Sequence, residues 1–399
     1  MDKLLVFTVL CCACVTMADY SIYYPTNYER TNLGDNIDSS TMLVLKATYE
    51  NEEEKNIVSS PLSVMMLLSL YNLGTGPDTK EEIRKFLGES EERNASHSFQ
   101  ELNTQFSKID PDQLTVAEII TVSDLYTLDE NFAATARDYR CELETLNFRK
   151  PEEAAAEINK WAGEKTKGHI KDPVSKDTLT EDTVVALFNV IYFAGHWHVP
   201  FKAEETKEKD FHVSRDSVVK KPMMHLLQSL YYYDSERLGA KLIELPYKEK
   251  GFRMIVVLPN EVDGLSSVVE KAANQGLLSA VFNLRPSGCD VDLDMPKFDI
   301  RSKIDFNKIL PKVGVSELFN EGAEGIVKEA AVKVSKVFQE AFIKVDEEGA
   351  TAGAFTGAVA IPMSSWSEPP PPIKFTVDHP FLYAIMYEDK ILFAGTYSE

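Results

Sequence analysis

The side chains that could do chemistry are few in this sequence, and none of them has the spacing of a known catalytic site. A hydrolase that works through a covalent intermediate needs a nucleophile on a tight turn, a histidine base and an acid that orients the base. The chain has no Gly-x-Ser-x-Gly, no His-Glu-x-x-His, no pair of Cys-x-x-Cys motifs and no glycine-rich phosphate loop. His196 and His198 could share one face of a strand as metal ligands, but no third ligand accompanies them, which favours a structural role. We therefore predict that the protein is not an enzyme and needs no metal or cofactor.

One stretch near the C-terminus has an unusual composition. Apolar and β-branched residues dominate at 337–345 and no breaker interrupts them, which predicts a buried strand. Two glutamates and a glycine follow, and then a run of Ala, Gly and Thr that predicts an exposed loop at about 347–372. Side chains alternate between the faces of a strand. The even positions from 350 to 360 are all small: Ala350, Ala352, Ala354, Thr356, Ala358 and Ala360. This composition is typical either of a flexible linker or of a segment that slips into a sheet as a new strand.

The elements around this stretch can be predicted from hydrophobic periodicity and from capping residues. They alternate without a strict βαβ order, so the predicted class is α+β. The expected elements are an N-terminal extension at 19–38, helices at 40–50, 61–73, 79–87 and 151–168, a buried strand at 184–193, a hairpin of 241–247 with 252–258, and a half-exposed strand at 290–295. Ser60 and Pro61 form a good start for the second helix, and Thr79 with Glu82 has the spacing of a capping box.

Several motifs resemble those of the serpin family. Glu347-Glu348-Gly349 followed by small residues, and HPFLYAIMYEDKILFAG at 379–395, are similar to the hinge and the C-terminal signature of serpins. Further motifs fall in the family's order: NIVSSPLSV at 56–64, INKWAGEKTKGHI at 158–170, NVIYFAGHWHVPF at 189–201, KPMMH at 221–225 and ELPY at 244–247. No single motif is specific, but together they span nearly all of the mature chain. The resemblance implies the serpin fold: mixed β-sheets with surrounding helices and an exposed C-terminal reactive loop.

The resemblance also implies a mechanism, for which serpins are the known example. A protease attacks the loop and forms an acyl-enzyme, and the severed segment then enters the large sheet before deacylation is complete. About ten new backbone hydrogen bonds, each contributing on the order of 1 kcal/mol, yield roughly 10 kcal/mol. The native form is then a kinetic trap. The expected partner is a target endopeptidase, held in a covalent 1:1 complex by a monomeric inhibitor.

The family pattern assigns two sets of residues to this mechanism. The hinge is Glu347, Glu348, Gly349, Ala350, Thr351, Ala352, Gly353 and Ala354. The residues expected to control opening of the sheet are Ser60, Ser63, Asn189, Gln339 and Lys297. Lys297 is the expected partner of Glu347. Gln339 stands where the family usually has a histidine, and its amide forms hydrogen bonds but carries no charge, which leaves the height of the opening barrier undetermined.

The family's usual spacing from Gly349 places the reactive bond between Met363 and Ser364. An unbranched apolar residue there suits a serine endopeptidase of the elastase or chymotrypsin type and does not suit a trypsin-like one. The stretch at 364–372 is longer than the family's usual span and ends in four prolines that favour an extended chain, so a later cut beside Trp366 is the alternative. Two other functions stay open, namely inhibition of papain-like cysteine proteases and a non-inhibitory carrier or storage role. The small hinge residues favour an inhibitor.

The N-terminus has the pattern of a secretion signal. Lys3 precedes an apolar run at 4–15, and small residues lie near Ala18. The run is too short to span a bilayer. We expect a signal peptide at 1–18, a single domain at 19–399 and a secreted, extracellular protein. The formal net charge of −21 argues against binding to nucleic acid or to an anionic membrane.

Two features follow from this expected location. Cys141 and Cys289 remain after the signal peptide, and a core of this size needs no disulfide, so we expect two unpaired thiols. Asn94 lies in the only glycosylation sequon, Asn94-Ala95-Ser96, within a polar stretch, so we expect a glycoprotein.

Overall fold

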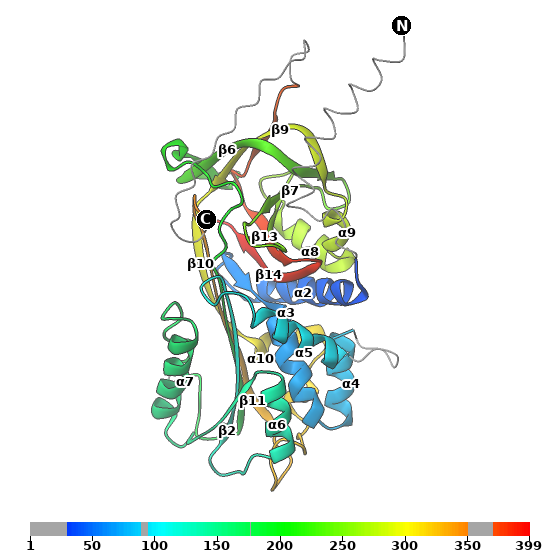
Figure 1. Cartoon of the computed structure of the whole chain (residues 1–399), viewed down its shortest axis with the longest axis vertical. Helices are drawn as coiled ribbons and strands as arrows, with labels where there is room; N and C mark the ends of the chain where they lie inside the picture. Colours follow the sequence, from blue (N-terminus) through cyan, green and yellow to red (C-terminus); the bar gives the residue numbers. More distant parts are fainter. Residues whose placement is uncertain (1–29, 89–94, 176, 350–369) are drawn as a thin grey trace.

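The computed structural model describes residues 30–88, 95–175, 177–349 and 370–399. Its described strands form two sheets, with the long strands of the smaller sheet running down the molecule below the larger one (Figure 1). The five-stranded sheet has, in spatial order, β10 (Phe298–Asp305), β11 (Val334–Val345), β4 (Val185–Phe193), β2 (Leu114–Ser123) and β3 (Glu142–Leu146). The nine-stranded sheet has β1 (Ile57–Ser59), β14 (Lys390–Tyr397), β13 (Phe381–Tyr387), β8 (Phe252–Pro259), β7 (Ala240–Pro246), β6 (Ser217–Ser235), β9 (Arg285–Pro296) and β12 (Ile373–Thr376), with β5 (Lys207–Ser214) beside β6.

Helices cover both faces of the five-stranded sheet. The described helices are α2 (Asn32–Asn51), α3 (Pro61–Tyr71), α4 (Pro77–Phe86), α5 (Ala95–Phe106), α6 (Glu130–Asp138), α7 (Pro151–Lys165), α8 (Leu265–Gln275), α9 (Leu278–Val281) and α10 (Phe306–Ile309). Short 3₁₀ turns occur at Asn72–Gly74, Ala203–Glu205, Leu310–Val313 and Glu317–Phe319. Figure 1 shows α7 on one face of the sheet and α3, α5 and α6 on the other.

This two-sided cover explains why β4 is apolar at almost every position. One of its faces packs into the main core with α3, and the other packs against Ile158 and Trp161 of α7. All nine residues of β4 are buried, as a strand covered on both faces requires. The strand predicted at 184–193 is therefore confirmed. So are the hairpin of β7 with β8 and the half-exposed β9.

Helix α3 also begins as predicted. Ser60 is its N-cap, and its hydroxyl accepts a hydrogen bond from the backbone N–H of Ser63. Pro61 occupies the first helical position, where its missing N–H has no cost. Every residue of the helix is buried.

Two helix starts were predicted wrongly. Helix α2 begins at Asn32, inside the expected extension, because distant groups satisfy its polar residues: Asp38 accepts the backbone N–H groups of Leu277 and Leu278. Helix α4 begins at Pro77 with Gly76 as its N-cap, so Thr79 and Glu82 form no capping box.

The carboxylates of Glu321 and Glu82 explain why the predicted capping box does not form. The N–H of Thr79 donates to Glu321 at 2.7 Å, and Glu82 accepts from the N–H groups of Ser316 and Glu317. Both contacts join α4 to a segment more than 200 residues away in the chain.

Several predictions lie outside the described residues. They are the signal peptide at 1–18, the glycosylation site at Asn94, the hinge residues Ala350, Thr351, Ala352, Gly353 and Ala354, and the reactive bond Met363–Ser364. Both cysteines that are described, Cys141 and Cys289, are free thiols, as predicted.

Candidate functional site: the sheet seam and the hinge

Strands β11 and β4 meet in the middle of the five-stranded sheet, and we call their contact the seam. The two strands are parallel, whereas β11 is antiparallel to β10 and β4 is antiparallel to β2. Their ladder runs from Val334 opposite Val185 to Ile343 opposite Phe193. Parallel ladders are slightly less stable per residue than antiparallel ones, so the seam is weaker than the two antiparallel ladders on either side of it.

The hinge leaves the sheet at the end of β11. Trp197 holds the chain at this exit: the indole N–H donates to the carbonyl of Asp346, just before the hinge, at 2.8 Å, and the Trp197 backbone N–H donates to the Glu348 carbonyl at 3.1 Å. The Phe201 N–H donates to the Glu347 carbonyl at 2.8 Å. The start of the hinge is therefore attached to the segment that follows β4, on the other side of the seam.

Gly349 is required where it stands. Its φ of +105° lies in a region that residues with a Cβ rarely adopt, and a Cβ there would lie 2.3 Å from the Gly195 carbonyl oxygen. The glycine thus lets the backbone turn while it stays in close contact with the segment around Gly195.

Glu347 forms a close polar cluster with two distant residues. Its carboxylate lies 2.7 Å from Lys297 Nζ and accepts a hydrogen bond from the Thr206 hydroxyl at 2.7 Å. Partial burial raises the pKa of Glu347, but the bonds from Lys297 and Thr206 outweigh it and hold the pKa below its ordinary value. The structure therefore brings Lys297 to the hinge, as the resemblance implies, and separates it from the other four residues of its set.

Those four residues meet beneath the seam. The Gln339 amide donates to Asn189 Oδ1 at 2.8 Å, to the Ser60 carbonyl at 2.9 Å and to the Ser63 hydroxyl at 3.1 Å. Its carbonyl oxygen accepts from the Ser60 N–H at 2.9 Å and from the Ser59 hydroxyl at 3.1 Å. All of these side chains are buried. Gln339 therefore ties β11 to β4 and to the start of α3 without a charge.

Two participants in these clusters were not predicted, Thr206 and Ser59. Thr206 is 141 residues from Glu347 in the chain, and Ser59 is 280 residues from Gln339. No local pattern marks either of them. Sequence reasoning could have proposed Ser59 only because it neighbours Ser60.

His196 and His198 have structural contacts. The His196 ring lies 3.1 Å from a Glu249 carboxylate oxygen, and the backbone N–H of His198 donates to Pro246. Desolvation lowers the pKa of His198. Within the described ranges, no group of three or more His, Cys, Asp or Glu side chains is arranged to hold a metal ion. No helix in these same ranges is long and apolar enough to cross a membrane.

Comparisons with known proteins give consistent results. The family model described as serpin, or serine protease inhibitor, matches residues 36–399. An antitrypsin of Bombyx mori is 33% identical over 98% of this chain and 99% of its own length. An antichymotrypsin of the same insect is 33% identical over 90% of this chain and 96% of its own length. The crystal structure of a highly specific serpin from Tenebrio molitor has a TM-score of 0.80 at 33% identity, over 92% of this chain and 98% of that one.

Proposed function

This chain belongs to the serpin family, and from that premise we propose that it is a secreted suicide inhibitor of a serine endopeptidase with hydrophobic specificity, of the elastase or chymotrypsin type. The inhibitor traps the acyl-enzyme by inserting its cleaved reactive loop into the five-stranded sheet. It acts as a monomer in a covalent 1:1 complex, and it is no enzyme in its own right.

The observation that carries this proposal is the closed parallel seam between β11 and β4. A segment that continues from β11 and folds back runs antiparallel to β11. Because β4 is parallel to β11, the same segment is also antiparallel to β4. Insertion therefore replaces one parallel ladder by two antiparallel ladders, which are the more stable kind. The small even-numbered residues from Ala350 to Ala360 suit the packed inner face of such a strand.

The choice of target rests on the sequence of the loop. Met363 at the cleaved bond suits a hydrophobic specificity pocket. Relatives named for trypsin and for chymotrypsin are equally similar to this chain, so family membership by itself supports no particular target. A cut beside Trp366 would lead to the same class of protease, because tryptophan is also large and apolar.

Incubation of the mature protein with elastase, chymotrypsin, trypsin and a papain-like enzyme tests this function. With elastase or chymotrypsin we expect a complex that resists denaturant. We also expect a released C-terminal peptide whose mass corresponds to the chain from Ser364 to the C-terminus. A complex with the papain-like enzyme alone would support the cysteine-protease alternative. Cleavage by all four enzymes with no complex would support a carrier or storage role instead.

The expected processing is part of the same proposal. Removal of residues 1–18 gives a secreted chain that begins at Asp19, and Asn94 carries a glycan in the extracellular protein. Mass analysis of protein secreted from an expressing animal cell, before and after removal of N-linked glycans, tests both statements. Retention of residue 1 in the secreted chain, or an unchanged mass after glycan removal, would contradict them.

A further inference from the structure

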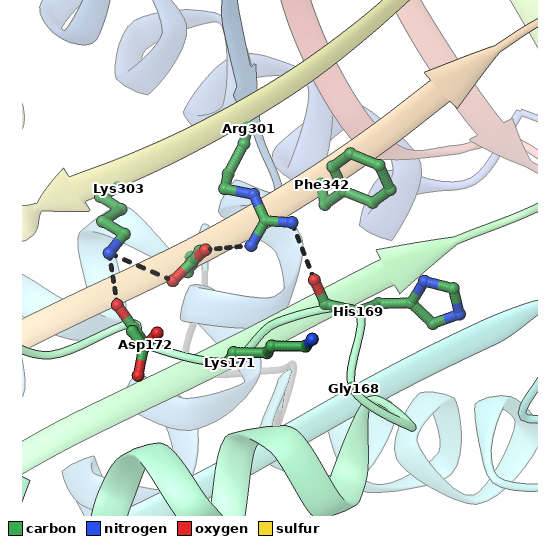
Figure 2. A pocket seen from close by; sticks show the side chains of 8 residues that line it. Gly168, His169, Lys171, Asp172, Arg301, Lys303 and Phe342 are labelled. Atoms are coloured by element: carbon green, nitrogen blue, oxygen red, sulfur yellow. Dashed lines mark hydrogen bonds and ion pairs between the residues drawn. The ribbon is translucent and has the colours of Figure 1, made fainter. Parts of the chain in front are cut away.

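Two cavities along the five-stranded sheet each contain a buried glutamate. The first, of about 500 Å³, contains Glu340 of β11, whose carboxylate accepts a hydrogen bond from Arg301 at 2.9 Å and lies 4.0 Å from Lys303 Nζ. Figure 2 shows Arg301 and Lys303 reaching from β10 into this cavity. A buried carboxylate needs a cation close by, and Glu340 has two. The second cavity, which we call the α5 cavity, contains Glu118 of β2.

The α5 cavity has a volume of about 280 Å³ and lies between α5, the start of β2 and the ends of α6 and α7. Leu114, Val116 and Glu118 alternate along β2, so they share the face that lines the cavity. A cavity with apolar walls and a few polar groups is typical of a site for a small ligand. The apolar walls are formed by Phe106, Ile109, Pro111, Leu114 and Val116.

Glu118 and Asn103 form the floor of the α5 cavity. Only 3% of the surface of Glu118 and 7% of that of Asn103 is exposed. The Asn103 side chain contacts the Glu118 carboxylate, but among the residues that the structure describes no Lys, Arg or His forms an ion pair with it. Unlike Glu340, Glu118 therefore lines a cavity that has room for a cation and does not already contain one.

Two cations lie at the rim of the cavity, Arg140 just after α6 and Lys165 at the end of α7, and both are exposed. Lys165 is paired with Glu142. The Arg140 side chain has no ion pair within the described ranges, and its φ of +59° is a left-handed conformation that usually suits glycine at the end of a helix. An arginine therefore stands at the rim in spite of backbone strain.

We propose that the α5 cavity binds a small linear zwitterion of the ω-amino acid class, with its ammonium at Glu118, its carboxylate at Arg140 and its apolar chain against the walls between them. The ammonium supplies the cation that the buried carboxylate lacks, and the guanidinium holds the carboxylate in a charge-assisted pair. This site goes beyond the proposed inhibition, because it uses no residue of the reactive loop or the hinge.

Binding of such a ligand should release a proton. Burial raises the pKa of Glu118 to about 8, so the carboxyl is protonated at pH 6.5 in the free protein. A bound ammonium favours the ionised form, so about one proton leaves for the buffer on binding, and affinity rises from pH 6.5 toward pH 8. The other ionisable groups on the packed elements are the Cys141 thiol, whose pKa burial also raises, and Arg140, Lys165 and Glu142.

Calorimetric titration of the intact protein with 6-aminohexanoate tests the site. We expect saturable binding, and proton release when the titration is repeated in two buffers of different ionisation enthalpy. Hexanoate lacks the ammonium and hexylamine lacks the carboxylate. Each should bind at least about tenfold more weakly than 6-aminohexanoate, because each leaves one charged group of the site unpaired.

Three variants assign the two ends of the ligand. Glu118→Gln keeps the shape of the floor and should bind 6-aminohexanoate at least about tenfold more weakly, without proton release. Arg140→Gln should weaken 6-aminohexanoate at least about fivefold and leave hexylamine unchanged. Arg137→Gln is the matched control, because Arg137 is exposed on the same helix and does not line the cavity. It should leave binding unchanged.

The outcomes separate the parts of this proposal. No saturable binding by the unmodified protein, equal affinity for hexanoate and 6-aminohexanoate, or unchanged binding in Glu118→Gln would overturn the site. Equal affinity for hexylamine and 6-aminohexanoate, or equal losses in Arg137→Gln and Arg140→Gln, would overturn the assignment of a zwitterion. The titrations with hexanoate and hexylamine use the unmodified protein, so they decide the matter even where a variant does not fold.

Discussion

At the scale of single residues, Glu118 is a buried acid without a compensating charge. It lies on β2, directly opposite Asn189 of β4, and its buried carboxylate has a polar contact with the Asn103 side chain, which lowers the pKa of Glu118 by less than burial raises it. Burial raises the pKa of Glu118 from an ordinary 4.5 to about 8. The native protein therefore keeps this proton in a range of pH where the unfolded chain has released it.

The pH dependence of stability follows from this difference. Because the folded-state pKa is raised, the stabilisation is complete below about pH 4.5 and is lost as pH rises toward 8. The loss approaches about 1.4 kcal/mol per pH unit within this window. Between pH 5.5 and pH 7.5 the free energy of unfolding of the unmodified protein should therefore fall. In the Glu118→Gln variant this fall should be smaller by about 2 to 3 kcal/mol. Urea unfolding at both pH values measures the loss.

The exposed Glu130 provides the comparison for this experiment. Its carboxylate is paired with Lys328 and has a lowered pKa, so it is ionised in both states across the same window. Glu130→Gln should leave the pH slope unchanged. Equal slopes for Glu118→Gln and the unmodified protein would show that Glu118 is ionised in the native state.

Gly349 supports a second prediction at this scale. The Gly349→Ala variant combines backbone strain at φ +105° with a clash against the Gly195 carbonyl, and should lower the free energy of unfolding by about 2 to 4 kcal/mol. Gly314 has φ +87°, and a Cβ at that position would meet no atom within 4 Å, so Gly314→Ala isolates the strain, about 1 kcal/mol. Urea unfolding gives both values, and equal losses would mean that the hinge can move away from Gly195.

At the scale of elements, β11 is the strand that leads into the proposed reactive loop. The strand is buried, is tied through Gln339 to β4 and α3, and ends at a hinge that Trp197 holds. In the proposed insertion the loop becomes a new strand, whose side chains alternate between the two faces of the sheet. The even-numbered residues from 350 to 360 must then enter the packed face.

Ala352→Arg is therefore expected to block insertion, because a charge would be buried in the packed face without a partner. The variant should be cut as a substrate, with at least about tenfold more inhibitor consumed per molecule of protease inactivated. Thr351→Arg places the same side chain on the opposite face and should remain an inhibitor. Titration of a protease with each variant measures the ratio of inhibitor consumed to protease inactivated. An unchanged ratio for Ala352→Arg would exclude insertion as the mechanism.

At the scale of the whole molecule, the proposed mechanism requires the closed five-stranded sheet to be the higher-energy arrangement. The seam is parallel, Arg301 of β10 donates a hydrogen bond to the His169 carbonyl in the link between α7 and β4, and the buried Gln339 cluster joins the two sides of the seam. In the proposed mechanism these contacts make opening slow without making the closed sheet the most stable state, which is the property of a kinetic trap.

Cleavage near Met363 should therefore stabilise the molecule. About ten new backbone hydrogen bonds contribute on the order of 10 kcal/mol, which predicts a rise in Tm of at least about 10 °C. Calorimetry before and after limited proteolysis gives the change. A nick elsewhere, in an exposed loop outside the hinge, should leave Tm unchanged or lower it. An unchanged Tm after cleavage near Met363 would contradict the trap.

Much of this protein was determined by the sequence alone, because the deciding interactions are local. The continuous apolar run of β4 predicted a strand covered on both faces, and Ser60 with Pro61 predicted the start of α3. The motif order identified the serpin family, and with it the meeting of Lys297 with Glu347. In each case the signal lies in neighbouring residues or in a pattern along the chain.

Only the tertiary structure decided which distant groups satisfy each buried charge or polar group. Thr206 at the hinge, Glu321 at the start of α4 and the pair of cations around Glu340 come from segments far away in the chain. A carboxylate in the sequence is compatible with many partners, and chain topology selects one of them. The parallel seam is also a matter of topology, since β4 and β11 are separated by more than 140 residues and no local pattern brings them together.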